Sequence, residues 1–136
     1  MDDSKLLKVE IISPERLFYE GEVEFIELST SEGDIGVYRN HIPMTNVLVP
    51  GVVKMHEGEN IKEAAVHSGF VVIMPEKITI MAEIAEWPEE IDINRAREAM
   101  LRAERRLSTS GHNINKERAE LALKRSIARL KLTKSL

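Results

Sequence analysis

Cysteine is absent from the 136 residues, which excludes disulfides, thiolate zinc sites and cysteine nucleophiles. Aromatic residues make up only 4% of the chain, so few rings are available for stacking on nucleic-acid bases. No run of about 18 apolar residues occurs, and no segment is predicted to cross a membrane. The 43% hydrophobic content nevertheless predicts a globular protein with a buried core. At this length we expect one domain, or one domain with an appendage.

The formal net charge of −4 is unevenly distributed along the chain. Residues 1–88 carry 16 acidic and 7 basic side chains, a net charge of −9. Residues 89–136 carry 7 acidic and 12 basic side chains, a net charge of +5. An acidic segment followed by a basic one predicts two parts with different surroundings.

Residues 6–87 show period-two alternation between turn signals, and β-branched residues dominate the runs. Many short strands at intervals of about ten residues predict an antiparallel sandwich or barrel. Gly69 lies inside the apolar run 64–73, which predicts a bulge or a close approach of two backbones. Gly33 and Gly36 bracket two residues and indicate a turn. They do not form a phosphate loop, because neither the Lys-Ser/Thr signature nor a helical pattern follows.

The segment after Trp87 and Pro88 is rich in Ala, Arg, Glu, Leu and Met, which favour helices. Asp92 is a candidate N-cap of a first helix, and Asn113 or Asn115 of a second. A break at residues 108–112 predicts an antiparallel helical hairpin. The apolar stripes of the two helices are rich in alanine: Ala96, Ala99, Met100, Ala103 and Leu107 in the first, and Ala119, Ala122, Leu123, Ile127 and Leu130 in the second. Alanine buries little area, so we expect a weakly held hairpin that can dock or open.

Catalytic signatures are missing. The four histidines, His41, His56, His67 and His112, include no pair spaced i, i+4, and no metal site is predicted. His67 is expected to be a hydrogen-bonded core or edge residue. No Gly-x-Ser-x-Gly elbow and no constellation for acid–base chemistry occurs. We therefore expect a protein that is not an enzyme.

Three arginines of the second segment can converge. Arg125 and Arg129 are spaced i, i+4 and share a helix face, and Arg95 begins the first helix at the end opposite the turn. Three guanidiniums there could bind a polyphosphate, with Glu86 and Asp92 accepting from an adenine amine. The alternative is that these arginines are solvated charges on helix faces.

Residues 31–51 carry three motifs in order: Gly33 to Gly36, His41 to Pro43, and Pro50-Gly51. Together with Ser-Gly-Phe at 68–70 and the alternating run at 78–83, they resemble the epsilon subunit of bacterial F-type ATP synthases over about residues 6–132. The resemblance implies an α+β fold. Residues 1–87 would form a ten-stranded antiparallel β-sandwich, and residues 88–136 a two-helix antiparallel hairpin.

The resemblance also implies a function as a non-catalytic central-stalk subunit that couples ion-driven rotation to ATP synthesis. The sandwich would bind the gamma subunit and the membrane rotor ring of c subunits, with Glu32, Asp34 and His41 facing the ring. The hairpin would lie folded on the sandwich or extend into the alpha and beta subunits of the catalytic head, where it blocks ATP hydrolysis. The protein would then be peripheral, at the cytoplasmic face of the cell membrane.

Some bacterial members of the family carry the nucleotide motif Ile/Leu-Asp-x-x-Arg-Ala, and residues 91–96 match it fully. The resemblance implies ATP as a regulatory ligand of the folded hairpin, with no obligatory cofactor and no metal. The preceding residues 87–90 and Ile93 depart from the family pattern and could reshape the pocket. The residues implied to bind ATP are Glu86, Ile91, Asp92, Arg95, Ala96, Arg125 and Arg129.

The runner-up hypothesis is a nucleic-acid-binding module whose basic hairpin contacts phosphates. The +5 charge and the arginines favour it. The absence of aromatic residues from the hairpin and the acidic charge of the whole chain speak against it.

Overall fold

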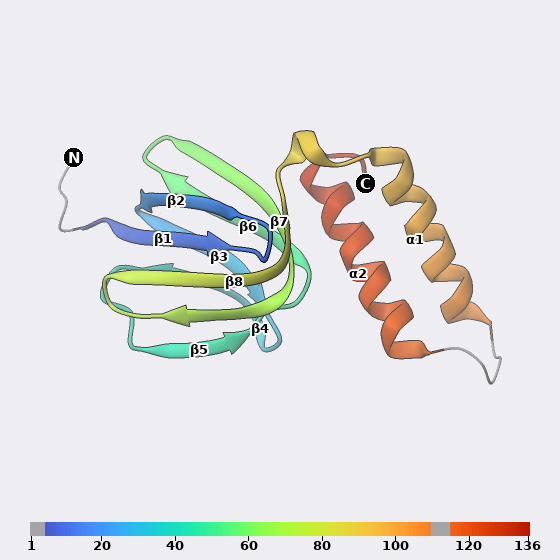
Figure 1. Ribbon diagram of the computed structural model, residues 1–136, viewed down its shortest axis with the longest axis horizontal. Helices are drawn as coiled ribbons and strands as arrows, with labels where there is room; N and C mark the ends of the chain where they lie inside the picture. The colour runs from blue at the N-terminus through green and yellow to red at the C-terminus, as the bar shows by residue number, and fades with distance from the viewer. Residues whose placement is uncertain (1–4, 110–114) are drawn as a thin grey trace.

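The computed structural model describes residues 5–109 and 115–136, and it shows a β-sandwich joined to a helical hairpin (Figure 1). A short 3-10 turn, η2, connects the two parts. The strands are β1 (Leu7–Ile12), β2 (Leu17–Val23), β3 (Phe25–Thr30), β4 (Gly33–Tyr38), β5 (Met44–Val47), β6 (Gly51–Glu57), β7 (Asn60–Ile73) and β8 (Lys77–Glu86). They are followed by η2 (Pro88–Glu90) and the helices α1 (Ile93–Ser108) and α2 (Lys116–Leu132).

The strands form one continuous sheet in the order β2-β1-β8-β7-β6-β3-β4, with β5 paired to β7 off this path. The sheet folds over into two layers (Figure 1). Strand β7 belongs to both layers, because residues 60–66 pair with β6 and residues 70–73 pair with β5. Between these halves Ser68 and Gly69 have φ angles of 61° and 117°, and the strand changes direction there. The sandwich expected from the alternating pattern is confirmed.

Two details of the expected sandwich are wrong. The described residues form eight strands and not ten. The 14-residue β7 runs without interruption through both layers, so one long strand occupies a place in each. The sheet is also not wholly antiparallel, since β1 pairs with β8 in parallel from Lys8 opposite Lys77 to Ile12 opposite Met81. These two strands are far apart in sequence, so no tight turn fixes their relative direction.

The close backbone approach expected at Gly69 is confirmed. A Cβ atom at this position would lie 1.9 Å from the carbonyl oxygen of Met81 on β8, far inside van der Waals contact. The positive φ is also a conformation that residues with a side chain rarely adopt. Glycine is therefore required where β7 crosses between the layers.

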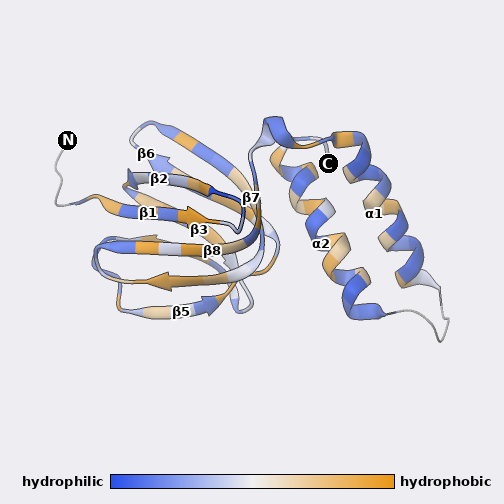
Figure 2. Cartoon of the chain, viewed as in Figure 1, coloured by the Kyte–Doolittle hydropathy of each residue, from blue (hydrophilic) through white to orange (hydrophobic). Residues whose placement is uncertain are grey.

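Large aliphatic side chains fill the space between the layers. Ile26, Met55, Ile73, Ile78 and Ile80 have no exposed surface. Apolar and polar residues alternate along the strands (Figure 2), as expected when one face of each strand is buried and the other is solvated. The core of the protein lies in the sandwich.

The hairpin has the predicted N-caps. The Asp92 side chain accepts from the backbone N–H of Arg95 at 3.2 Å, and the Asn115 side chain accepts from that of Arg118 at 3.1 Å. Helix α1 ends at Ser108, at the start of the break expected at 108–112; residues 110–112 of that break and Asn113 lie outside the described residues. Helix α2 packs between α1 and strands β6 and β7. Neither helix in the described part of the chain is long and apolar enough to cross a membrane.

Candidate functional site

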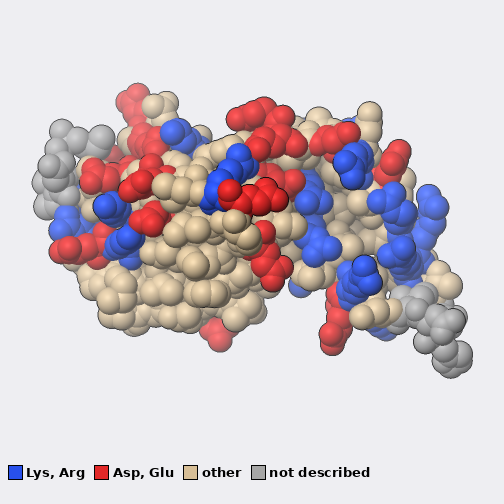
Figure 3. All heavy atoms as spheres, in the orientation of Figure 1, with Lys and Arg blue, Asp and Glu red and all other residues tan. Residues whose placement is uncertain are grey.

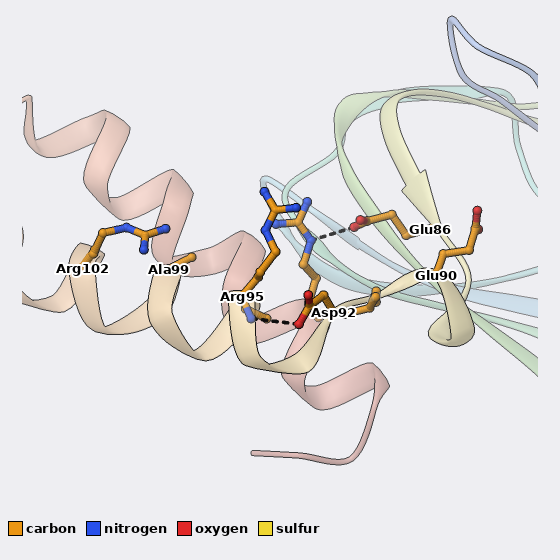
Figure 4. A pocket seen from close by; sticks show the side chains of 9 residues that line it. Glu86, Glu90, Asp92, Arg95, Ala99 and Arg102 are labelled. Atoms are coloured by element: carbon orange, nitrogen blue, oxygen red, sulfur yellow. Dashed lines mark hydrogen bonds and ion pairs between the residues drawn. The ribbon is translucent and has the colours of Figure 1, made fainter.

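A cavity of about 410 Å³ opens where β8, η2, α1 and α2 meet (Figure 4). Its volume lies in the range of small-molecule sites, about 300–1,000 Å³. The walls come from the sandwich side and from both helices, so the cavity is complete only while the hairpin is docked. It is lined by Glu86, Glu90, Ile91, Asp92, Arg95, Ala96, Ala99, Arg102 and Arg129.

The η2 turn is fastened to the sandwich on one side of the cavity. The Trp87 ring stacks on the Phe18 ring with a centroid distance of 4.2 Å. Glu90 accepts from the Trp87 backbone N–H at 2.9 Å and from Arg16 Nη2 at 2.7 Å. These contacts hold the beginning of the connection to α1 in place, and the cavity wall with it.

Arginine side chains supply the positive charge of the site. Arg95 and Arg102 are seven residues apart on α1, so they share one face of that helix. Neither has an ion-pair partner within residues 5–109 and 115–136. A guanidinium without a carboxylate partner can bind a phosphate oxygen through two parallel N–H donors.

Arg129 of α2 is paired with Glu86 of β8. Its Nε donates to Glu86 Oε1 at 2.7 Å (Figure 4), and the same oxygen lies 2.9 Å from His67 Nε2. Burial of Glu86 by itself penalises its charged form, but the hydrogen bonds from His67 and Arg129 outweigh this penalty and lower the pKa of the carboxyl. Glu86 is therefore a carboxylate at neutral pH and joins the sandwich to the hairpin.

Asp92 has a structural role as well as a place in the cavity wall. One carboxylate oxygen caps α1 through the Arg95 backbone N–H. The exposed carboxylate keeps further acceptor capacity that faces the cavity. Within the described residues no group of three or more His, Cys, Asp or Glu could hold a metal ion.

The structure brings six of the seven predicted nucleotide residues to this cavity, and Arg125 is the exception. Arg125 lines an adjoining cavity of about 210 Å³, which shares Ala99 and Arg102 with the first. Sequence reasoning missed Glu90, Ala99 and Arg102. The seven-residue spacing of Arg102 from Arg95 could have revealed Arg102. Glu90 lines the cavity only because the η2 turn brings it there, which no local pattern shows.

The three residues expected to face the rotor ring do not lie together. Glu32 is in the β3–β4 turn and Asp34 is in the first residues of β4. Asp34 shares a groove with Lys124 and Lys131 of α2. His41 follows the opposite end of β4, where the backbone N–H of the neighbouring Asn40 donates to Pro75 O in the β7–β8 turn. The length of β4 separates the two positions.

The sequence matches the family description "ATP synthase, Delta/Epsilon chain, beta-sandwich domain" over residues 6–88 and "ATP synthase, Delta/Epsilon chain, long alpha-helix domain" over residues 89–134. The chain belongs to this ATP synthase delta/epsilon family. The resemblance noted from the motifs is confirmed, and this member is an epsilon-type, non-catalytic subunit of the central stalk. The family assignment decides against the nucleic-acid-binding hypothesis.

Bacterial members of the family are similar over nearly their whole length. The ATP synthase epsilon chain of Halalkalibacterium halodurans is 42% identical over 125 residues, which cover 91% of this chain and 94% of that protein. The epsilon chain of Caldanaerobacter subterraneus subsp. tengcongensis is 40% identical over 129 residues, with 94% of each chain covered.

Among solved structures, a chain of the Euglena gracilis mitochondrial ATP synthase (OSCP/F1/c-ring) has the same fold. The TM-score is 0.81 at 20% identity, with 93% of this chain and 80% of that chain covered. A chain in the central stalk and c-ring structure of the Tetrahymena thermophila mitochondrial ATP synthase has a TM-score of 0.59 at 17% identity, with 93% and 96% covered.

Proposed function

We propose that this stalk subunit inhibits ATP hydrolysis through its hairpin, and that ATP bound in the 410 Å³ cavity holds the hairpin in the docked, non-inhibiting state. The observation that carries the proposal is the gathering of Glu86, Asp92, Arg95 and Arg129 around one cavity whose walls come from both parts of the chain. Undocking dismantles this cavity, so a ligand that fills it binds only the docked state.

The chemistry of the cavity fits a nucleoside triphosphate. Arg95 and Arg102 are available for the phosphates, and Arg129 stands beside them. Glu86 and Asp92 offer carboxylate oxygens to the amine of an adenine, and Ile91 adds an apolar surface for the base. The cationic groups suit the triphosphate of ATP, and the carboxylates and Ile91 suit its adenine. Arg125 lines the adjoining cavity and would contact the far end of the polyphosphate.

The size of the effect follows from linkage. A ligand at a hundredfold excess over its Kd stabilises the state that binds it by about 2.7 kcal/mol. A hairpin whose buried contacts are largely alanines is held weakly enough for this amount to decide its position. When ATP is scarce, the hairpin opens and its basic side chains pair with acidic surfaces of the alpha and beta subunits.

The gamma subunit is proposed to bind the apolar outer face of the sandwich. Val47 of β5 pairs with Phe70 of β7, which pairs with Met81 of β8, which pairs with Ile12 of β1. Three of these side chains are exposed: Val47 (59%), Phe70 (45%) and Met81 (39%). Figure 3 shows a broad area of the sandwich without charged atoms. A continuous apolar patch of this kind is typical of a protein–protein interface.

The β3–β4 turn, with Glu32 and Asp34, is proposed to meet the loops of the rotor ring, and His41 would contact a different neighbour at the other end of β4. With the gamma subunit bound to the outer face of the sandwich and the rotor ring bound to the β3–β4 turn, the subunit rotates with the stalk. It thereby couples ion-driven rotation of the ring to ATP synthesis. The subunit is then peripheral, on the cytoplasmic side of the cell membrane.

Calorimetric titration of the full chain with ATP tests the nucleotide site. We expect Arg95→Ala and Arg129→Ala to weaken binding at least tenfold and Arg125→Ala to weaken it less. The matched control is Arg105→Ala, which removes an exposed arginine of α1 that does not line the cavity. If Arg95→Ala and Arg129→Ala both bind ATP like the parent protein, the proposed site is wrong.

A further inference from the structure

His67 is a buried histidine that the proposed nucleotide site does not use. It lies on β7 with 1% of its surface exposed. Its Nε2 is 2.9 Å from Glu86 Oε1, and its Nδ1 is buried without a hydrogen-bond partner among the described residues. Buried polar atoms without partners are uncommon and call for an explanation.

His67 is hydrogen-bonded to Glu86, the residue of the sandwich that pairs with Arg129 of the hairpin. Glu86 Oε1 accepts from both His67 Nε2 and Arg129 Nε. One oxygen therefore links β7, β8 and α2. The donors lie on different elements, so the His67 ring fixes the direction in which the Glu86 carboxylate meets the hairpin.

We propose that His67 is a positioning residue that holds the Glu86 carboxylate toward Arg129, and that protonation of His67 loosens the docked hairpin. The inference rests on the proposed function in one respect, namely that the hairpin can undock. The effect of His67 on docking does not require nucleotide to be bound.

The charged groups around His67 explain why its protonation opposes docking. Glu86 faces it from β8, and Arg129 and Arg125 act on it from α2. Strand β6, on the other side of β7, places the backbone of Gly51 opposite Val66, next to His67. A proton on Nδ1 would bring a positive charge near two guanidiniums and would leave a buried N–H without an acceptor.

Burial lowers the pKa of His67, the hydrogen bond that its ring donates to Glu86 opposes this, and the two arginines lower the pKa further. At neutral pH the ring is therefore uncharged, with Nε2–H donating to Glu86. When α2 leaves, the two guanidiniums leave with it, and the pKa of His67 rises toward its ordinary value of 6.5. The open state then takes up a proton more readily than the docked state, so docking weakens as pH falls below 6.5.

The size of this loss follows from the difference in proton uptake. With His67 protonated only in the open state, the docking equilibrium falls by up to about fourfold at pH 6.0 and up to about tenfold at pH 5.5. Glu86 titrates in a lower window, since its own pKa is lowered from 4.5. The two contributions are therefore separable by pH.

A unique thiol can report docking, because the chain has no cysteine. Ala128 of α2 is 3% exposed and lines the groove against the sandwich. The rate of thiol modification of Ala128→Cys in the full chain therefore measures opening. We would compare this rate with that of Ala128→Cys/His67→Gln at each pH, so that the thiolate fraction cancels. Glutamine keeps an N–H donor near the position of Nε2 and does not titrate.

We divide the modification rate of Ala128→Cys, which keeps His67, by that of Ala128→Cys/His67→Gln. This ratio should be near one at pH 7.5 and should rise severalfold by pH 5.5, because only the variant with His67 opens more as the pH falls. Ala128→Cys/His67→Leu, which lacks the donor, should open more than both at pH 7.5. A ratio that stays at one across this range, or a His67→Leu form as closed as the parent, overturns the inference. Absence of ATP binding at every pH would overturn the proposed nucleotide site and leave this readout intact.

Discussion

The sandwich and the hairpin are held together by different kinds of contact. In the sandwich, fully buried Ile, Leu, Val and Met side chains pack between two layers of paired strands. In the hairpin, most of the buried residues are small: Ala96, Ala103, Ala119, Ser126 and Ala128, with Leu130 and Leu132 near its end. Removing a large aliphatic side chain from water contributes about 1.5–3 kcal/mol, and an alanine much less.

This difference separates a strongly packed part of the chain from a weakly packed one. The sandwich needs all of its strands to bury its core, so it is stable only as a whole. The hairpin adds a weaker apolar contact, which polar links such as Glu86–Arg129 supplement. In the proposed mechanism, the hairpin opens while the sandwich remains folded on the stalk.

The largest expected effect is in the core of the sandwich. Ile80→Ala removes a side chain with no exposed surface and should lower the free energy of unfolding by about 2–5 kcal/mol. Urea denaturation followed by far-ultraviolet circular dichroism measures it. The conservative Ile80→Val should lose only about 0.5–1.5 kcal/mol. Equal losses in both variants would mean that the core is not packed around this side chain.

Leu130→Ala should act on the hairpin alone. Leu130 is the largest fully buried side chain of the helices, with 1% exposed, and we expect its truncation to weaken docking by about 2–3 kcal/mol. Hydrogen exchange should become faster throughout α2 and stay unchanged in β7 and β8. If the protection of both parts falls together, the chain is one cooperative unit, and the hairpin does not open independently of the sandwich.

Acid should release the hairpin before it unfolds the sandwich. The hydrogen bonds from His67 and Arg129 stabilise the Glu86 carboxylate against the cost of burial, so its pKa is lower in the docked state than the ordinary 4.5. The stabilisation is complete above that value and is lost as pH falls through the lowered pKa.

Glu86→Gln removes the titrating group. It should weaken docking at pH 7 by about 1–2 kcal/mol and abolish the part of the acid loss that occurs below pH 4.5. Hydrogen exchange of α2 as a function of pH measures both effects. An unchanged acid profile in Glu86→Gln would show that another group controls docking in this range.

The smallest expected effect concerns a helix cap remote from the cavity. Asn115→Ala removes the acceptor for the Arg118 backbone N–H and should destabilise α2 by about 1 kcal/mol. Asn115→Asp keeps an acceptor and should match the parent. Helix content by circular dichroism and the urea midpoint of the sandwich, measured together, show whether the loss stays within the hairpin.

Much of the candidate site could be predicted from local patterns. The 91–96 motif, the capping preference of Asp92 and the spacing of Arg125 and Arg129 are all readable in the sequence. Arg125, however, lines the adjoining smaller cavity and not the one that gathers the other six predicted residues. An i, i+4 pair shares a helix face, but it spans more than one turn, and a cavity the size of the larger one receives only one of the two.

The pairings between distant segments could not be predicted. Nothing in the alternating pattern shows that β1 runs parallel to β8 or that His41 lies a strand length from Glu32. Nor does the sequence show that His67 forms a hydrogen bond with Glu86. These relations depend on how the layers fold over, which many long-range contacts decide together.

The sequence by itself determined the local structure: alternating strands up to residue 86, an alanine-rich hairpin after residue 92, and an acidic part followed by a basic one. Periodicity, capping and charge act over a few residues, so they can be read along the chain. Only the tertiary structure decided that Glu86 would take one hydrogen bond from the buried core of the sandwich and one from the hairpin. That arrangement depends on the packing of α2 against the sheet, which brings Arg129 to two neighbouring strands that lie far from it in sequence.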